Sequence, residues 1–284
     1  MPRDWRTTGT GTSCTRRRRH HSEDLSRGKE STPVELCVGD AGTRPSEFRY
    51  RKDRWPHGCF LSRGPALFRV CCDCTDGCSD AKHCACVAMT TGGRGYSHQR
   101  LLEPVPLYEC GPWCGCVRSR CQNRLVQRGL RVRLQVFQTE DRGWGVRCRD
   151  DLDRGTFVCI YAGERSLKRG AEMEEVCFID ANKEGNVSRF INHNCKPNLF
   201  IQNVFTDSHD PAFPVIAFFT SRVVKSGTEL TWDYAADAYA DPGQKQEVPC
   251  LCGSSDCRHV VLKRVRLPNC ASPVKQLQVL EVKD

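Results

Sequence analysis

The stretch Arg189 to Asn198, which reads RFINHNCKPN, combines several side chains that can do chemistry. Asn192 and His193 offer amide and imidazole groups that can hold a polar ligand, and Cys195 offers a thiolate. The Pro-Asn pair at the end of the stretch favours a sharp turn. This mixture fits neither a plain amphipathic helix nor a plain strand, so it indicates a binding loop. The alternative for so short a motif is a polar turn after an apolar residue.

Cysteines between residues 72 and 121 have the spacing of metal ligands. Nine of them do not divide into separate four-cysteine sites, but three tetrahedral zinc ions need twelve metal–sulfur bonds, which nine thiolates supply when three of them bridge. A closed cluster of this kind acts as a scaffold and not as a catalyst. A disulfide-rich knot is the alternative. The nine residues are Cys72, Cys74, Cys78, Cys84, Cys86, Cys110, Cys114, Cys116 and Cys121.

The composition favours metal over disulfides. The chain has 284 residues and 21 cysteines, and no window has the run of about 18 apolar residues that a membrane span needs. Its N-terminus, MPRDWRTTGTG, has no apolar core of a secretory signal. We therefore expect a protein that stays inside the cell, without a membrane partner, where thiols remain reduced.

A second cysteine group lies near the C-terminus. Cys250, Cys252 and Cys257 supply three ligands, one short of a closed tetrahedral site. Cys195, which lies apart from the other cysteines in the sequence, can supply the fourth ligand. The alternative is a local site whose fourth ligand is Cys270 or His259.

The elements that must position these residues are short strands. RVRLQVFQT alternates apolar and polar residues as a half-buried strand does, and FVCIYAG has the β-branched and aromatic content of a buried one. Further short strands are predicted at VELCV, EFRYR, LFIQNVF, VIAFF and ELTWD. Residues 1–34 are rich in Arg, Ser, Thr and Gly without a hydrophobic period, so we predict a disordered basic arm. The fold class is mainly β.

Two motifs carry a family resemblance. RFINHNCKPN and the ELTWDY of Glu229 to Tyr234 resemble the two signatures of SET-domain protein lysine methyltransferases. GWG at Gly143 to Gly145, YAGE at Tyr161 to Glu164 and the cysteine arrays extend the resemblance over residues 49–262. The sequence is most similar to the bifurcated SET-domain histone H3 lysine-9 methyltransferases, nearest their smaller second paralogue. This similarity lies in the segments CCDCTDGC and NVFTDSHDPAFPVIAFFTSRVVKSGTELTWDY.

The resemblance implies a domain order. A pre-SET zinc-cluster domain would occupy residues 35–126, and a SET domain, a short-strand β-fold with a pseudoknot, would occupy residues 127–236. A post-SET zinc segment at 237–266 and a tail at 267–284 would follow. The resemblance also implies three zinc ions in the pre-SET cluster, and one at the post-SET site with Cys195 as its fourth ligand.

The resemblance assigns roles to particular residues. Tyr234 would be the catalytic tyrosine, Tyr161 a second hydroxyl in the lysine channel, and Trp232 the aromatic residue that limits how many methyl groups fit. Glycines in GWG would let the backbone approach S-adenosylmethionine. A structural histidine is the alternative for His193. The implied cofactor contacts are Arg142, Gly143, Trp144, Gly145, Arg189, Asn192 and His193.

The implied activity is methyl transfer from S-adenosylmethionine to lysine 9 of histone H3. Such an enzyme would be a monomeric catalytic unit in the nucleus, on the chromosome, with the histone H3 tail and chromatin as partners. The alternative is a catalytically impaired zinc scaffold that binds chromatin, because only RSLKRGAEMEE separates Glu164 from Val176, where family members carry more.

The net charge of +9 suggests a third hypothesis, a basic zinc protein that binds nucleic acid. Thirteen thiolates and four divalent ions would together carry −5 and lower the net charge from +9 to +4. Much of the remainder lies in Arg16 to Arg19, where DNA contact through the arm is an expectation.

Overall fold

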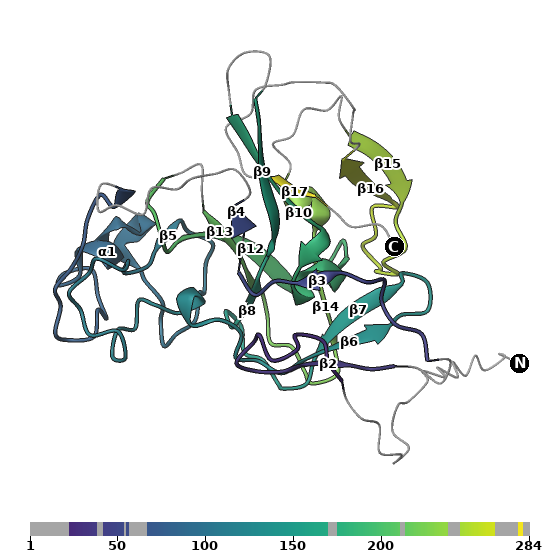
Figure 1. Cartoon of the computed structure of the whole chain (residues 1–284), viewed down its shortest axis with the longest axis horizontal. Helices are drawn as coiled ribbons and strands as arrows, with labels where there is room; N and C mark the ends of the chain where they lie inside the picture. Colours follow the sequence, from purple (N-terminus) through teal and green to yellow (C-terminus); the bar gives the residue numbers. More distant parts are fainter. Residues whose placement is uncertain are drawn as a thin grey trace, which may run out of the picture.

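The computed structural model describes residues 23–38, 42–53, 55–56, 67–169, 175–210, 214–237, 245–264 and 278–280. The predicted fold class is confirmed, because the described residues form mainly short strands around one short α-helix, α1 (Ala85–Met89). Figure 1 shows α1 and its loops at one end of the molecule and the hairpin of β15 and β16 at the other. Short 3-10 turns are η2 (Thr91–Gly93), η3 (Val126–Arg128), η4 (Val187–Phe190) and η5 (Tyr234–Asp237).

A six-stranded sheet joins the two signature motifs. Its order is β1-β2-β6-β7-β14-β11, and β11 lies parallel to β14 although other strands separate them in sequence. The predicted strands at VELCV, RVRLQVFQT and ELTWD are confirmed as members of this sheet. The strands are β1 (Glu23–Asp24), β2 (Val34–Leu36), β6 (Leu134–Gln138), β7 (Trp144–Cys148), β14 (Glu229–Trp232) and β11 (Asn192–His193).

A four-stranded sheet ties the cysteine-rich lobe to the rest. Its order is β5-β12-β13-β8, and every residue of β13 is buried. The pattern-based strands at LFIQNVF, VIAFF and FVCIYAG are confirmed here, and β5 of the cysteine-rich lobe pairs with β12 in parallel. The strands are β5 (Leu107–Tyr108), β12 (Leu199–Phe205), β13 (Val215–Thr220) and β8 (Phe157–Ile160).

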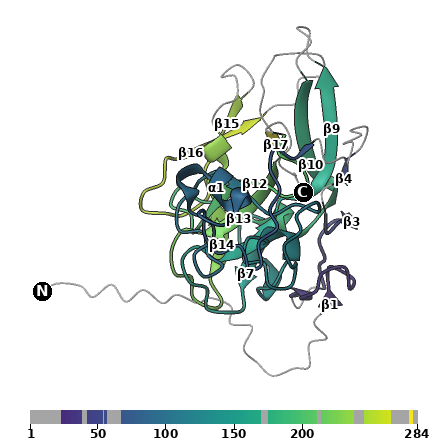
Figure 2. The same cartoon turned by 90° about the vertical axis from the view of Figure 1, so that its left-hand side faces the viewer.

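The shortened segment after Glu164 forms a hairpin. Strands β9 and β10 pair antiparallel from Glu164 opposite Asp180 to Arg169 opposite Glu175. In both views one end of the β9–β10 hairpin projects beyond the other sheets, while its other end lies among them (Figures 1 and 2). Strands β3 and β17 pair with β10, and β4 pairs with β9, in the same sheet. Strands β15 and β16 form a separate two-stranded sheet. The strands are β9 (Gly163–Arg169), β10 (Glu175–Gly185), β3 (Arg49–Tyr50), β4 (Trp55–Pro56), β17 (Gln278–Leu280), β15 (Lys245–Pro249) and β16 (Val260–Arg264).

Part of the predicted disordered arm is ordered, so that prediction is wrong for residues 23–34. The Asp24 carboxylate accepts backbone N–H groups of Ser26 at 2.9 Å, Gly28 at 2.8 Å and Val34 at 3.0 Å. A single acidic side chain thus closes a polar loop that has no hydrophobic period. Val34 is fully buried beside β6, which fixes the end of the loop. Residues 1–22 lie outside the described residues.

The cysteine-rich lobe has a core made of sulfur. Its buried cluster contains seven cysteines and one aliphatic residue, Val87. The two other clusters consist mainly of aliphatic and aromatic side chains. Hydrophobic burial alone therefore stabilises the sheets better than the cysteine-rich lobe.

Gly155 connects the lobes and provides a test of the fold. Its carbonyl accepts the Leu101 N–H at 2.9 Å, its φ is +78°, and a Cβ there would lie 2.5 Å from the Leu101 carbonyl oxygen. Gly227 also has a positive φ, of +86°, but a Cβ there meets nothing within 4 Å. We expect Gly227→Ala to cost about 1 kcal/mol from backbone strain, and Gly155→Ala to cost roughly 1–3 kcal/mol more from the clash.

Thermal unfolding of the zinc-loaded chain measures both variants. A clearly lower Tm for Gly155→Ala than for Gly227→Ala is the expected order. Equal Tm values would show that the contact with Leu101 does not constrain the fold.

Candidate active site and metal centres

The two signature motifs lie side by side because β11 pairs with β14. Asn192 is opposite Thr231, and the buried side chain of Asn198 completes the pairing. Asn198 Nδ2 donates to the Glu229 carbonyl at 2.7 Å, and its Oδ1 accepts the Thr231 N–H at 2.9 Å. The Asn198 side-chain amide thus makes the two hydrogen bonds to β14 that the backbone of a neighbouring strand would otherwise make. Sequence reasoning treated Asn198 only as part of a turn.

The Glu229 carboxylate joins two of the predicted cofactor residues, Arg142 and Asn192. It accepts from Arg142 Nη2 at 2.7 Å and from Asn192 Nδ2 at 3.0 Å. Asn192 Nδ2 also lies 3.2 Å from the Trp144 carbonyl oxygen. A Cβ on Gly145 would lie 2.9 Å from Glu229 Oε1, so glycine is needed there for the carboxylate to approach. Glu229 was missed, although it begins the ELTWDY motif.

Gly143 shapes the turn between β6 and β7. Its φ is +66°, a conformation that favours glycine. Its carbonyl accepts from both the N–H and the Oγ1 of Thr139, each at 2.7 Å. Arg142 and Trp144 therefore flank a fixed turn, and Trp144 is buried.

The three predicted aromatic residues form one group through Phe218. The rings of Trp232 and Tyr234 lie 4.9 Å apart, and Phe218 lies 5.5 Å from Trp232 and 6.3 Å from Tyr161. Tyr161 and Trp232 are buried, while Tyr234 is half-buried. The Tyr234 hydroxyl donates to the Ile191 carbonyl at 2.9 Å. Phe218 was predicted only as part of a strand.

His193 connects Tyr234 to a cysteine. Its Nδ1 accepts the Tyr234 N–H at 3.2 Å, so the ring proton is assigned to Nε2, which lies 3.3 Å from Cys195 Sγ. Asp233 is 3.6 Å from the same Nδ1 and accepts from Arg258 Nη2 at 2.5 Å. The imidazole therefore supports the surrounding loops as well as lying at the predicted cofactor site.

The Arg189 guanidinium lies over two phenylalanine rings. Its guanidinium carbon is 4.4 Å from the centre of the Phe48 ring and 5.0 Å from that of Phe190. Such cation–π contacts anchor the start of the motif against the N-terminal segment.

The second cysteine group has the geometry of a closed metal site. The four Sγ atoms lie within 4.8 Å of one another, and those of Cys195 and Cys250 are 3.8 Å apart. Tetrahedral zinc with Zn–S bonds near 2.3 Å needs S···S edges of about 3.8 Å. Cys270 lies outside the described residues, and the N–H of His259 donates to Cys257 Sγ at 3.3 Å. The group is Cys195, Cys250, Cys252 and Cys257.

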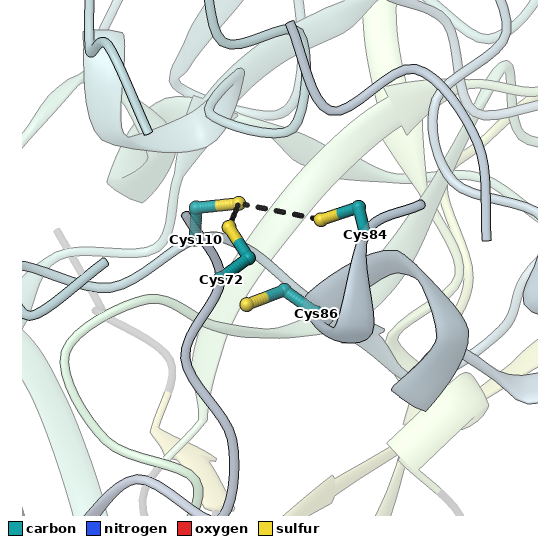
Figure 3. A group of neighbouring side chains, drawn as sticks. All are labelled: Cys72, Cys84, Cys86 and Cys110. Carbon is teal, nitrogen blue, oxygen red and sulfur yellow. Dashed lines mark hydrogen bonds between the residues drawn. The ribbon is translucent and has the colours of Figure 1, made fainter. Parts of the chain in front are cut away.

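The first cysteine group contains overlapping sets of four. Cys72 belongs to three such sets, and Cys78, Cys84 and Cys110 each belong to two. Figure 3 shows one set with its sulfur atoms facing each other, where Cys110 lies 3.6 Å from Cys72 and 4.0 Å from Cys84. Shared thiols are what bridging between metal ions requires. All described cysteines are free, so the disulfide knot is wrong for them.

The surroundings of these thiols suit zinc. Burial raises the pKa of Cys72 and of Cys78, so both thiols would keep their protons at neutral pH unless a cation replaced them. Asn123 Nδ2 donates to Cys110 Sγ and Arg124 Nη2 to Cys116 Sγ, each at 3.5 Å. Donors of this kind orient thiolates at metal sites. The residues present therefore could hold zinc in both groups.

Comparison with known proteins agrees with this geometry. Residues 26–124 match the Pre-SET motif, and residues 143–235 match the SET domain. The chain belongs to the SET-domain family. The second match contains Gly143 to Gly145, both signature motifs and Tyr234, and the first contains the nine-cysteine array.

Among curated relatives of this SET-domain chain are histone-lysine N-methyltransferases. The SETDB2 protein of Danio rerio is 45% identical over 313 residues, which cover 74% of this chain and 56% of the relative. The eggless protein of Drosophila melanogaster is 30% identical over 363 residues, covering 83% of this chain and 28% of the relative. The chain thus spans somewhat more than half the length of the SETDB2 relative and under a third of the eggless protein.

Solved structures show the same fold. Arabidopsis thaliana SUVH6 in complex with SAM is 33% identical with a TM-score of 0.70, over 84% of this chain and 55% of that one. KRYPTONITE in complex with mCHH DNA, an H3(1-15) peptide and SAH is also 33% identical with a TM-score of 0.70, over 84% and 53%. The methyltransferase domain of human SETMAR is 28% identical with a TM-score of 0.65, over 84% and 97%.

Removal of one thiol tests the second metal site. We expect Cys257→Ser to lower the zinc content by one ion per chain, because three thiolates do not close the site. The C-terminal segment should then become more sensitive to proteolysis, since the site ties it to the loop that carries His193. Elemental analysis and limited proteolysis measure the two effects.

Cys37→Ser is the matched control, because Cys37 belongs to none of the four-thiol groups. Unchanged zinc in Cys257→Ser would contradict the site.

Proposed function

We propose that this chain transfers methyl groups from S-adenosylmethionine to lysine 9 of histone H3, in the nucleus, as a chromatin repressor. The histone-lysine N-methyltransferase names of the relatives support this class of reaction. The KRYPTONITE complex with an H3 peptide and SAH supports the substrate and the cofactor. The choice of lysine 9 and the role in repression rest on the resemblance of the motifs.

The observation that carries the proposal is the position of the Tyr234 hydroxyl. The hydroxyl donates to the Ile191 carbonyl at 2.9 Å, which fixes its orientation, and a phenolic oxygen can accept an N–H of a lysine amine. A free lysine has a pKa near about 10.4, so the site must favour the neutral amine that attacks. The buried rings of Trp232 and Tyr161 provide an apolar wall that disfavours the charged form.

S-adenosylmethionine, when bound, supplies a methyl group on a sulfonium that the amine can attack in line. Asn192, Trp144 and the Arg142–Glu229 ion pair are the residues that would hold it, together with the backbone of Gly143 and Gly145. Their mutual hydrogen bonds fix the site before the ligand arrives. His193 supports Tyr234 by accepting its backbone N–H at 3.2 Å.

The proposal includes four structural zinc ions and a monomeric catalytic unit. Three ions would occupy the overlapping thiol sets, and one would bind the group that includes Cys195. The proposed partners are the histone H3 tail and chromatin. DNA contact by Arg16 to Arg19 is also proposed, and this stretch lies outside the described residues. No helix in the described part of the chain is long and apolar enough to cross a membrane.

Loss of the Tyr234 hydroxyl tests the activity. We expect Tyr234→Phe to lower methyl transfer to an H3 peptide by roughly a hundredfold, because the amine loses its oriented acceptor. Affinity for S-adenosylhomocysteine should stay within about twofold, since the hydroxyl bonds the Ile191 carbonyl and the ring remains. Radiolabel transfer measures the first and calorimetry the second.

An H3 peptide with arginine in place of lysine 9 is the substrate control. Absence of both transfer and cofactor binding in the zinc-loaded parent would instead favour the chromatin-binding scaffold.

Removal of the Glu229 charge tests the cofactor loop. We expect Glu229→Gln to weaken S-adenosylhomocysteine binding about tenfold, because the Arg142 and Asn192 side chains lose a shared charged acceptor. Glu103→Gln is the control, since Glu103 lies at the surface with only Arg94 at 3.7 Å. Calorimetric affinities of the two variants should differ, and equal affinities would contradict the role of Glu229.

A further inference from the structure

A cavity of about 250 Å³ lies apart from the residues of the proposed methyl-transfer site. It opens between the N-terminal segment, the connection after η3, and strands β8 and β13. Val126, Leu130, Phe157 and Val215 give it apolar walls. Neither the predicted catalytic residues nor the grouped cysteines line it. Its volume is enough for one long side chain or a small organic cation, and below that of most drug-sized sites.

The charged groups of the cavity are mostly acidic. Glu30, Asp53 and Asp207 supply three carboxylates, against the one ammonium of Lys52. Within the described chain, neither Lys52 nor Asp53 forms a hydrogen bond or ion pair. Lys52 instead lies across Gly129, where its Cε is 3.5 Å from the position of an added Cβ. The cavity lining therefore carries three carboxylates and one ammonium, a formal excess of negative charge.

Glu30 is the decisive residue, because it is buried and only half satisfied. It is 9% exposed, and its Oε1 accepts the Tyr50 hydroxyl at 3.0 Å. Its Oε2 receives no hydrogen bond from the described residues. Burial raises the pKa of Glu30, while the hydrogen bond from Tyr50 and the positive charge of Lys52 act against that rise. Its Oε2 is accessible from the cavity that Glu30 lines, where it can accept a hydrogen bond from a cationic donor.

We propose that this cavity binds an alkyl cation, whose guanidinium or ammonium head meets Glu30 and Asp53 while its hydrocarbon stem lies against Val126 and Phe157. Arginine and lysine side chains have this chemistry, and so do small free amines. A planar guanidinium can bond Glu30 Oε2 and a second carboxylate at once. The site is independent of the proposed methyl transfer, because its residues take no part in that reaction.

Calorimetric titration of the zinc-loaded full chain with butylguanidinium chloride, at constant ionic strength and neutral pH, tests the site. We expect saturable binding to one site per chain. Asp53→Asn and Glu30→Gln should each weaken it at least tenfold, because each removes a charged partner of the cation. Glu103→Gln, a surface acid outside the cavity, should leave it unchanged.

Two comparisons identify the source of the cation. Tighter binding of acetyl-Ala-Arg-Ala-amide than of butylguanidinium supports an arginine of a polypeptide, and weaker binding of the peptide supports a small free amine. No saturable binding, or equal affinities for the parent and Asp53→Asn, would overturn the proposal. Asp53 is exposed, so its variant decides the matter even if Glu30→Gln fails to fold.

Discussion

The short parallel pairing of β11 with β14 is the interaction on which the rest of the site depends. It has two residues on the β11 side, and the Asn198 side chain extends it with two more hydrogen bonds. Because Glu229 and Trp232 lie on β14, the pairing fixes both the carboxylate that holds Asn192 and the ring that packs on Tyr234. A shift of one residue would separate all of these partners.

Thiols gather at both ends of the molecule, and in the cysteine-rich lobe they take the place of an apolar core. In the cysteine-rich lobe, the buried side chains are nearly all sulfur, so a metal that neutralises them would supply the stability that hydrophobic burial supplies elsewhere. Near the C-terminus, Cys195 belongs to the same loop as His193, which supports Tyr234. Zinc held by the group that includes Cys195 would therefore tie the C-terminal segment to the loop of the proposed active site.

One buried carboxylate joins the cysteine-rich lobe to the sheets. Glu109 precedes Cys110 and accepts the N–H groups of Leu125 at 2.7 Å and Val126 at 2.6 Å, together with the Tyr96 hydroxyl at 2.8 Å. These bonds satisfy the backbone N–H groups at the start of η3, the turn that leads into the SET-domain sheets. The acid cavity lies against the same turn, so the junction between the lobes is both rigid and partly open.

The sequence by itself determined the local features. Alternation in RVRLQVFQT predicted β6, and β-branched and aromatic runs predicted β8, β12 and β13, because side-chain period reports which face a strand buries. The residues of the two signature motifs identified the family, and the spacing of the cysteines predicted the thiol clusters. Only the tertiary structure decided which distant groups meet. Glu229, Asn198 and Phe218 act through partners far along the chain, and Asp24 orders a polar loop that pattern alone assigned to disorder. No local pattern encodes the contacts of Glu229, Asn198 and Phe218, because pairing between remote strands is chosen by packing of the whole core. The Asp24 contacts are local, and an acidic side chain that bonds nearby backbone N–H groups orders a loop without any hydrophobic period.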